Sequence, residues 1–258
     1  MGKPISIIFI NICIDDIYMT DNLTEFEKTL DFQEIINGIA RKGDGSFHKK
    51  MEHKYSPTEL SGCVRNSFFS RLYPEEYDDR TLRVFLLGNV LHELVQDNVK
   101  EVLGDKLDHI ENEKAFHYLL PMDKTNGKRI LISGRLDSIF FLKGDDKPII
   151  VDYKTTANSY YNKINGPKKE HIDQVNYYLA NTLADHGMVV YIDKRNLEVV
   201  QHTVSFSQEI FDEMVNFAIQ LDGALDTKIT PPVDYPLMED RGNCKYCRHK
   251  VKCKEAGR

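Results

Sequence analysis

The spacing of the cysteines constrains the fold of this chain more than any other feature of its sequence. The chain has 258 residues and five cysteines, and Cys244, Cys247 and Cys253 fall within ten residues near its end. Cys63 lies about 180 residues upstream of them. An odd number of cysteines argues against a disulfide framework, and their clustering favours a metal site. Four thiolates can hold zinc, which is the more common answer on spacing alone, or a four-iron four-sulfur cluster. Cys13 is left over, and we expect it to be an ordinary buried thiol.

The charge distribution excludes a chain that is basic throughout. The net charge is −6, but residues 241–258 carry seven basic side chains against one acidic one, around the clustered cysteines. No apolar run approaches the roughly 20 residues that a membrane-spanning helix needs. The apolar run from Ile5 to Ile14 is followed by Asp15-Asp16 rather than by the small residues of a signal-peptide cleavage site. The sequence therefore predicts a cytoplasmic protein with no membrane partner.

The order of helical and extended patterns predicts an α/β fold with one sheet flanked by helices. Helices are expected over residues 23–40, from Ser56 to about Tyr73 with Cys63 inside, and over 81–103 and 170–186. A last long helix is expected from a capping box of Ser205 and Gln208 to about Leu225. Strands are expected over residues 128–142, 149–154, 188–192 and 197–206, which form two hairpins. We divide the chain into an N-terminal extension (1–54), a core (55–230) and a C-terminal cysteine segment (231–258) that packs back on the core.

Two aspartates mark the first predicted hairpin. Asp137 lies in the first strand and Asp152 in the second, and paired strands lie within about 5 Å of each other. Lys154 is two residues beyond Asp152, so both side chains point to the same face, while Tyr153 points to the other. Converging carboxylates suit Mg²⁺ or Mn²⁺, and an adjacent lysine can orient a water molecule for phosphodiester hydrolysis. An isolated D-x-K sequence is more often a solvated strand end, so the neighbouring motifs decide between the two interpretations.

Five motifs follow one another in a fixed order: Gly88-x3-His92, Asp137, Asp152-x-Lys154, Gln174-x3-Tyr178, and one upstream cysteine with three near the C-terminus. Over residues 55–258, this order resembles the PD-(D/E)XK nuclease superfamily in its RecB-like iron–sulfur branch. Within that branch, the layout is most similar to the CRISPR-associated exonuclease family, the fourth Cas family. The chain has Val64-Arg65 where members often have Pro-Arg after the upstream cysteine.

The resemblance implies a restriction-endonuclease-like mixed sheet and a metal centre within it. It implies that His92, Asp137, Asp152 and the backbone carbonyl of Tyr153 bind the ion. An imidazole ligand favours Mn²⁺ over Mg²⁺. Lys154 would position the water and act with these residues in catalysis.

The resemblance also implies supporting roles for residues outside the metal centre. Gln174 and Tyr178 lie four positions apart on one helix face, and they would hold the DNA backbone or Lys154 in place. Cys63, Cys244, Cys247 and Cys253 would bind a four-iron four-sulfur cluster rather than zinc.

The implied activity is a metal-dependent DNA exonuclease that acts on single-stranded ends. Its implied setting is the processing of DNA fragments for CRISPR spacer acquisition, together with the adaptation integrase. Two other interpretations remain open at this point: a RecB-like nuclease of DNA repair, recombination, replication or a virus, and a non-catalytic DNA-binding adaptor joined by zinc.

Overall fold

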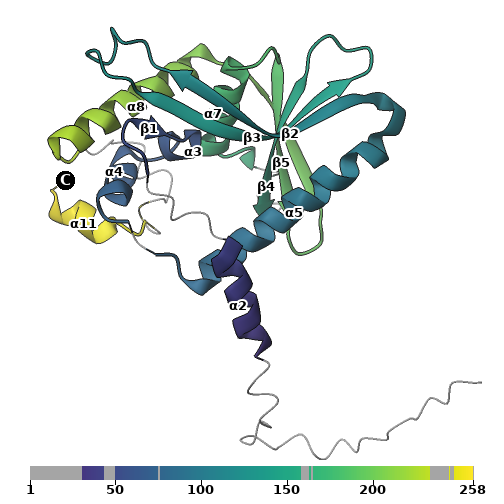
Figure 1. Ribbon diagram of the computed structural model, residues 1–258, viewed down its shortest axis with the longest axis horizontal. Coiled ribbons are helices and arrows are strands. Elements are labelled where there is room, and N and C mark those ends of the chain that lie inside the picture. Colours follow the sequence, from purple (N-terminus) through teal and green to yellow (C-terminus); the bar gives the residue numbers. More distant parts are fainter. Residues whose placement is uncertain are drawn as a thin grey trace, which may run out of the picture.

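A mixed β-sheet forms the centre of the molecule (Figure 1). The computed structural model describes residues 31–43, 50–74, 76–157, 163, 165–232, 244 and 247–257. Within these residues the strands are β1 (Lys54–Tyr55), β2 (Leu107–Leu119), β3 (Leu131–Leu142), β4 (Ile149–Thr156), β5 (His186–Asp193) and β6 (Val199–Ser205). Their order is β1-β3-β4-β5-β6, and β2 also pairs with β3.

The pairing directions confirm both predicted hairpins. β3 and β4 are antiparallel, and so are β5 and β6. β4 and β5 run parallel, so the chain must cross over the sheet between them, and it does so through a helix. The sheet is therefore mixed, as the sequence predicts.

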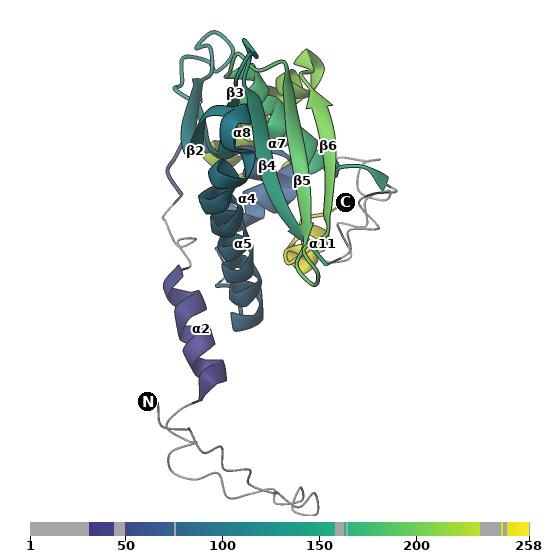
Figure 2. The same cartoon turned by 90° about the vertical axis from the view of Figure 1, so that its right-hand side faces the viewer.

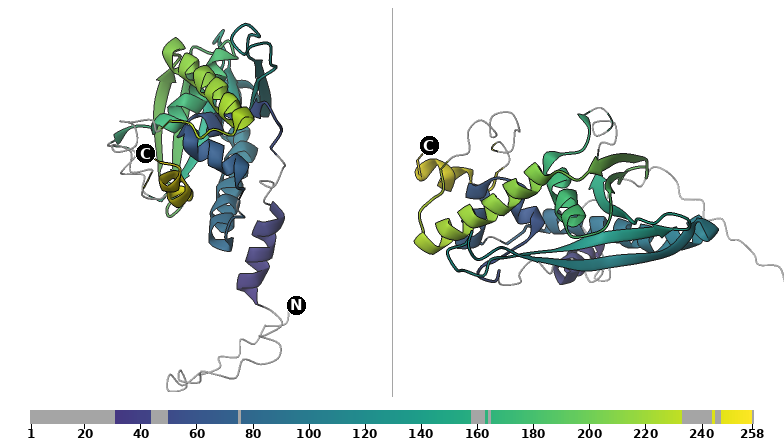
Figure 3. Two further views of the ribbon diagram at one scale, coloured as in Figure 1. Left: turned by 90° about the vertical axis from the view of Figure 1, so that its left-hand side faces the viewer. Right: turned by 90° about the horizontal axis from the view of Figure 1, so that it is seen from above.

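Helices cover both faces of the sheet (Figures 2 and 3). The helices are α2 (Phe32–Gly43), α3 (Pro57–Leu60), α4 (Val64–Leu72), α5 (Asp79–Leu103), α7 (Lys169–Ala180), α8 (Gln208–Thr227) and α11 (Lys250–Glu255), and a 3₁₀ turn spans Gly104–Lys106. α5 packs on one face with the apolar side chains of Val95 and Val99 against Val151 and Tyr153. α3, α4, α7 and α8 share the larger core on the other face, which includes Phe68, Tyr177 and Leu221.

α2 lies along the N-terminal part of α5 with its polar side inward. Arg41 of α2 pairs with Asp79 of α5 at 2.6 Å, and Asn37 is buried beside Ala40. The apolar side chains of Phe32 and Ile36 are exposed. α2 confirms the later part of the predicted helix and ends at Gly43, three residues beyond the predicted end. Residues 23–30 lie outside the described part of the chain, as does Cys13.

The prediction that Cys63 lies inside the first core helix is wrong. α3 ends at Leu60, and Cys63 is the residue before α4, with an extended backbone (φ −101°, ψ 125°). The Ser61 hydroxyl donates to the Thr58 carbonyl at 3.1 Å, a local bond that competes with helix continuation. Gly62 has a high conformational entropy and adds no side-chain packing to a helix. Because of this break, Cys63 lies between α3 and α4 and is not part of a helix.

Two further boundaries differ from the sequence prediction, and one strand was missed. α7 ends at Ala180, before the predicted end at residue 186, because the Asn181 side chain donates to the Tyr177 carbonyl and β5 begins at His186. Ser207, rather than Ser205, caps α8 and accepts a hydrogen bond from Ile210 N. β2 was not predicted at all. No helix in the described part of the chain is long and apolar enough to cross a membrane.

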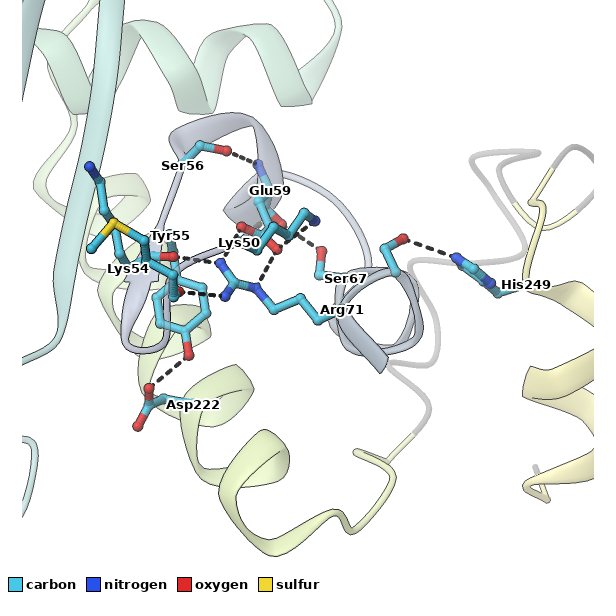
Figure 4. A network of polar contacts seen from close by, with 11 residues as sticks. Lys50, Lys54, Tyr55, Ser56, Glu59, Ser67, Arg71, Asp222 and His249 are labelled. Atoms are coloured by element: carbon cyan, nitrogen blue, oxygen red, sulfur yellow. Dashed lines mark hydrogen bonds and ion pairs between the residues drawn. The ribbon is translucent and has the colours of Figure 1, made fainter. Parts of the chain in front are cut away.

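A buried ion pair connects β1, α3 and α4 (Figure 4). Arg71 donates to both carboxylate oxygens of Glu59, at 2.7 and 2.8 Å, and also to the carbonyl oxygens of Met51 and Lys54. Its guanidinium lies 4.3 Å above the ring of Tyr55, whose hydroxyl donates to Asp222 of α8 at 2.7 Å. This network fixes α4, and hence Cys63, relative to the sheet.

Candidate active site

The two predicted aspartates meet where β3 and β4 separate. The last paired residues of the two strands are Ser138 and Val151, and Asp137 and Asp152 are the next residue of each strand. Beyond this point the backbone N–H of Tyr153 donates to Asp137 Oδ2 at 2.7 Å instead of to a strand partner. The Asp137 carboxylate therefore ends the pairing of β3 with β4 and lies beside Asp152. We call this point, where the two strands separate, the fork.

Lys154 projects to the same side of β4 as Asp152. Its Nζ lies 2.8 Å from Asp152 Oδ2 and donates to Gln174 Oε1 of α7 at 3.0 Å. Gln174 is 6 % exposed, so its amide is fixed by packing. Lys154 is held between a strand and a helix, with its ammonium group at the fork.

His92 reaches the fork from α5, on the opposite face of the sheet. Its Nδ1 lies 3.9 Å from Asp137 Oδ2, and its ring centroid lies 5.9 Å from that of Tyr153. Gly88, one turn earlier, faces Thr155: a Cβ there would lie 3.6 Å from the threonine hydroxyl, an ordinary contact. The helix thus approaches β4 closely just before His92.

Burial makes the fork an unfavourable place for negative charge. Removal from water raises the pKa of Asp137 to about 6, and the pKa of Asp152 is also raised to about 6, with the neighbouring Asp137 charge adding to the effect of burial. Burial and the Lys154 cation lower the pKa of His92. A neutral imidazole and two carboxylates in need of a counter-charge are the state that a divalent ion would stabilise.

The types of donor atom at the fork suit a divalent cation. Asp152 Oδ2 is buried and, apart from the ion pair with Lys154, has no hydrogen-bond partner. Buried carboxylate oxygens in proteins are normally hydrogen-bonded or bound to metal. Two carboxylates, one imidazole and a nearby carbonyl form an oxygen-rich set with one nitrogen, which suits Mn²⁺ or Mg²⁺.

Tyr178 supports the fork through the backbone of β3. Its hydroxyl donates to the carbonyl oxygen of Arg135 at 2.8 Å, two residues before Asp137. This approach requires Gly134, because a Cβ there would lie 2.8 Å from the Tyr178 hydroxyl and 2.7 Å from Pro57. Gln174 and Tyr178 therefore hold different parts of the site: one contacts Lys154 and the other the β3 backbone.

Three residues near the fork were not predicted. Gln96, one turn after His92, donates to the carbonyl oxygen of Asp137 at 2.8 Å. Glu113 of the unpredicted strand β2 pairs with Arg135 at 2.6 Å and has a positive φ of 56°. His171 lies on α7 one turn before Gln174. The i, i+4 spacing from His92 could have indicated Gln96, and the i, i−3 spacing from Gln174 could have indicated His171, whereas Glu113 approaches the site only through tertiary packing.

The four predicted cluster cysteines lie near one another: Cys63 interacts electrostatically with Cys247 and Cys253, and Cys247 with Cys244 and Cys253. Burial raises the pKa of Cys63 and of Cys247, and neighbouring thiols among the four raise both further. Cys247 Sγ lies 3.6 Å from Asn66 Oδ1, and Arg65 Nη1 lies 3.5 Å from Cys253 Sγ. Among the described residues, the one group of three side chains whose ligand atoms all lie within 4.8 Å of one another is His53, Asp222 and Asp226. Neither the cysteines nor the three side chains at the fork are that close together.

The chain is similar to several solved structures, and the first of them shares its fold. The crystal structure of SSO0001 covers 86 % of this chain and 96 % of its own, with a TM-score of 0.59 and 21 % identity. An alkaline exonuclease from Laribacter hongkongensis covers 68 % of this chain and 91 % of its own, with a TM-score of 0.42 and 16 % identity. A phage-related exonuclease from Haemophilus somnus covers 64 % and 81 %, with a TM-score of 0.42 and 15 % identity. No curated protein matches the chain.

A family model confirms the superfamily that the motifs indicated. The model described as the PD-(D/E)XK nuclease superfamily matches residues 45–254, which include every motif residue from Cys63 to Cys253. The match also spans both strands of the fork and all of α5 and α7. The chain belongs to the PD-(D/E)XK nuclease superfamily.

Proposed function

We propose that this chain is a divalent-metal-dependent DNA exonuclease that acts on single-stranded ends. The observation that carries the proposal is the convergence of Asp137, Asp152 and Lys154 at the fork, with His92 3.9 Å from Asp137. Superfamily membership supports phosphodiester hydrolysis as the reaction. The buried and poorly compensated carboxylates explain why this reaction would depend on a divalent ion.

His92, Asp137, Asp152 and the carbonyl of Tyr153 would hold Mn²⁺ or Mg²⁺. When bound, such an ion supplies a water nucleophile at neutral pH and neutralises charge at phosphorus. Asp137 is held for this role by the Tyr153 N–H, and Asp152 by Lys154. His92 is supplied in the neutral form that a ligand needs, because its pKa is lowered.

Lys154 would act on the water and the phosphate directly. Its ammonium group is confined by Asp152 and by Gln174, which leaves it one N–H for a water molecule or a phosphate oxygen. A charged donor in a partly buried site stabilises the negative charge that develops in the transition state. Gln174 contributes by fixing the position of Lys154, and Tyr178 by fixing the β3 backbone beside Asp137.

We further propose that Cys63, Cys244, Cys247 and Cys253 bind a four-iron four-sulfur cluster. Four thiolates can hold such a cluster, one on each iron. The one-plus-three layout of the cysteines, with Cys63 far upstream of the other three, supports the cluster over zinc. Protein purified without oxygen should be brown, whereas a zinc protein would be colourless.

The setting that we propose is the trimming of DNA fragments for CRISPR spacer acquisition, in contact with the adaptation integrase. The order of the five motifs and the one-plus-three cysteine layout support it. The test is integration of duplexes with long single-stranded overhangs by the integrase, with and without this protein. Correct trimming should require wild-type protein and be lost with Lys154→Ala.

The exonuclease activity is tested with linear and circular single-stranded DNA of the same sequence, in Mn²⁺. An enzyme that needs an end digests the linear form and leaves the circle intact. A label at the 5′ or the 3′ end, followed over time, gives the polarity. Rapid cutting of the circle would contradict the end requirement, and loss of neither form would contradict the nuclease assignment.

A further inference from the structure

His171 is an imidazole beside Lys154 for which the proposed mechanism has no role. It lies on α7, three residues before Gln174, so the two side chains share a helix face. Its Nδ1 lies 2.7 Å from the hydroxyl of Tyr191. Tyr191 on β5 is the register partner of Lys154 on β4. His171 is thus held on the lysine side of the fork.

The hydrogen bonds around Tyr191 assign the tautomer of His171. The backbone N–H of Lys168 donates to the Tyr191 hydroxyl oxygen at 2.9 Å. The phenol has one proton to give, and among the described residues His171 Nδ1 is its only acceptor. Nδ1 is therefore the acceptor of the imidazole, and the ring proton lies on Nε2. Tyr191 fixes both the orientation and the protonation of the ring.

The Nε2–H of His171 points away from this bond and reaches solvent. Nε2 has no hydrogen-bond partner among the described residues. Asp152 Oδ2 is a buried polar atom without such a partner, but His171 Nε2 is not buried in this way. Burial of the ring and the nearby Lys154 and Lys168 cations lower the pKa of His171 to about 3. The site therefore presents a neutral, pre-oriented N–H donor next to the catalytic lysine.

We propose that His171 Nε2–H donates a hydrogen bond to a phosphate oxygen of the DNA strand bound at the fork. Phosphate oxygens are acceptors only, and a rigid donor binds them at a low entropic cost because its orientation is fixed in advance. Lys154 contributes a positive charge, while His171 contributes an oriented hydrogen bond to a neighbouring oxygen or to the adjacent phosphate. This inference rests on the proposed nuclease function and adds a substrate-binding residue to it.

The test compares His171→Ala with His171→Gln, because a glutamine amide can donate from a position close to that of Nε2. Loss of a hydrogen bond to a charged group should raise the KM for single-stranded DNA roughly tenfold in His171→Ala. His171→Gln should recover most of the affinity, and kcat should change less than KM in both. Direct binding of labelled DNA, measured by fluorescence anisotropy in an Asp152→Ala background, should show the same order.

Tyr191→Phe tests the assignment of the tautomer without touching the imidazole. The ¹⁵N shifts of the His171 ring should report an Nε2–H tautomer in the wild type and a mixture in Tyr191→Phe, with an intermediate KM. A purely structural role would lower the melting temperature and leave KM unchanged. Equal KM and DNA affinity in folded His171→Ala and wild type would overturn the inference, whereas an inactive wild type would instead overturn the nuclease proposal.

Discussion

The guanidinium of Arg65 donates a hydrogen bond of 2.7 Å to the backbone carbonyl of Gly257, 192 residues further along the chain. The same side chain donates to the carbonyl oxygens of Pro231 and Cys253. Arg65 is 6 % exposed, so all of these bonds are formed away from water. Arg65, two residues after Cys63, thus fixes the C-terminal cysteine segment against α4.

Replacement of Arg65 by methionine should loosen that segment. Three backbone carbonyls would lose their donor, and each buried unsatisfied group costs roughly 1–3 kcal/mol. Hydrogen exchange in residues 247–257 should become faster, and the cluster proposed at the cysteines should be lost more readily. Arg248→Met is the control, because the Arg248 guanidinium stacks on Tyr77 at 4.3 Å and is exposed. If hydrogen exchange in residues 247–257 is equally fast in Arg65→Met and Arg248→Met, Arg65 does not fix this segment.

Asp152→Asn should raise the thermal stability of the metal-free protein at pH 7.5. The pKa of Asp152 is about 6 in the fold and ordinarily about 3.8, so the fold favours the protonated carboxyl. This contribution to stability is complete below pH 3.8 and is lost as the pH rises through 6. The asparagine amide does not ionise, so the Asp152→Asn variant does not lose this stability as the pH rises.

The measurement is the melting temperature in excess chelator at pH 7.5 and pH 4.5. The gain from Asp152→Asn should be present at the higher pH and shrink at the lower. Asp97→Asn, at an exposed position on α5, should change neither value. A lower melting temperature for Asp152→Asn at pH 7.5 would contradict the electrostatic account of the fork.

Arg71→Met should destabilise the fold by about 3–5 kcal/mol, because Glu59 would keep a buried charge without its main partner. The two side chains are 8 % and 9 % exposed. Chemical denaturation measures the effect, and the double variant Arg71→Met with Glu59→Gln should recover part of it. Lys50→Met removes the half-exposed partner of the same carboxylate and should cost less than about 1 kcal/mol. Similar losses for Arg71 and Lys50 would argue against the buried pair.

Gln174→Leu should lower kcat by roughly 10- to 100-fold, because Lys154 would lose the acceptor that fixes its ammonium group. KM should change little, since this role is confined to orientation. Single-turnover digestion of a labelled oligonucleotide measures the rate of the chemical step. Gln208→Leu, at an exposed position at the start of α8, is the control. An unchanged single-turnover rate for Gln174→Leu would show that Gln174 does not position Lys154 for the chemical step.

The sequence predicted the elements whose patterns are local. The hairpin around residues 143–148 has apolar strands and a polar turn, and α5 ends at a glycine, so both were found to within a few residues. β2 was missed because its side chains are mostly polar and only Leu107 is buried. A strand that pairs along β3 with little packing on its own faces carries no alternating apolar pattern.

The site could be predicted only where its residues form short motifs. Asp152 and Lys154 share a face because of the two-residue period of a strand, and Gln174 shares one with Tyr178 because of the helical period. The contacts of Arg65 with Gly257 and of Tyr191 with His171 join distant segments, and they depend on packing that a single sequence does not encode locally. The break at Gly62 likewise follows from short-range side-chain bonds rather than from periodicity.

The central claim is that Asp137, Asp152 and His92 form one metal centre for DNA hydrolysis. The most direct test is the rate of nucleotide release from linear single-stranded DNA in Mn²⁺, in excess chelator, and with Asp152→Asn or Glu93→Gln. Glu93 neighbours His92 but is exposed on α5, so it is a matched control. We predict wild-type rates for Glu93→Gln, and rates at least 100-fold lower for Asp152→Asn and for wild type without metal, as expected when a group that acts in the transition state is lost. Equal digestion by Asp152→Asn and wild type would contradict the account.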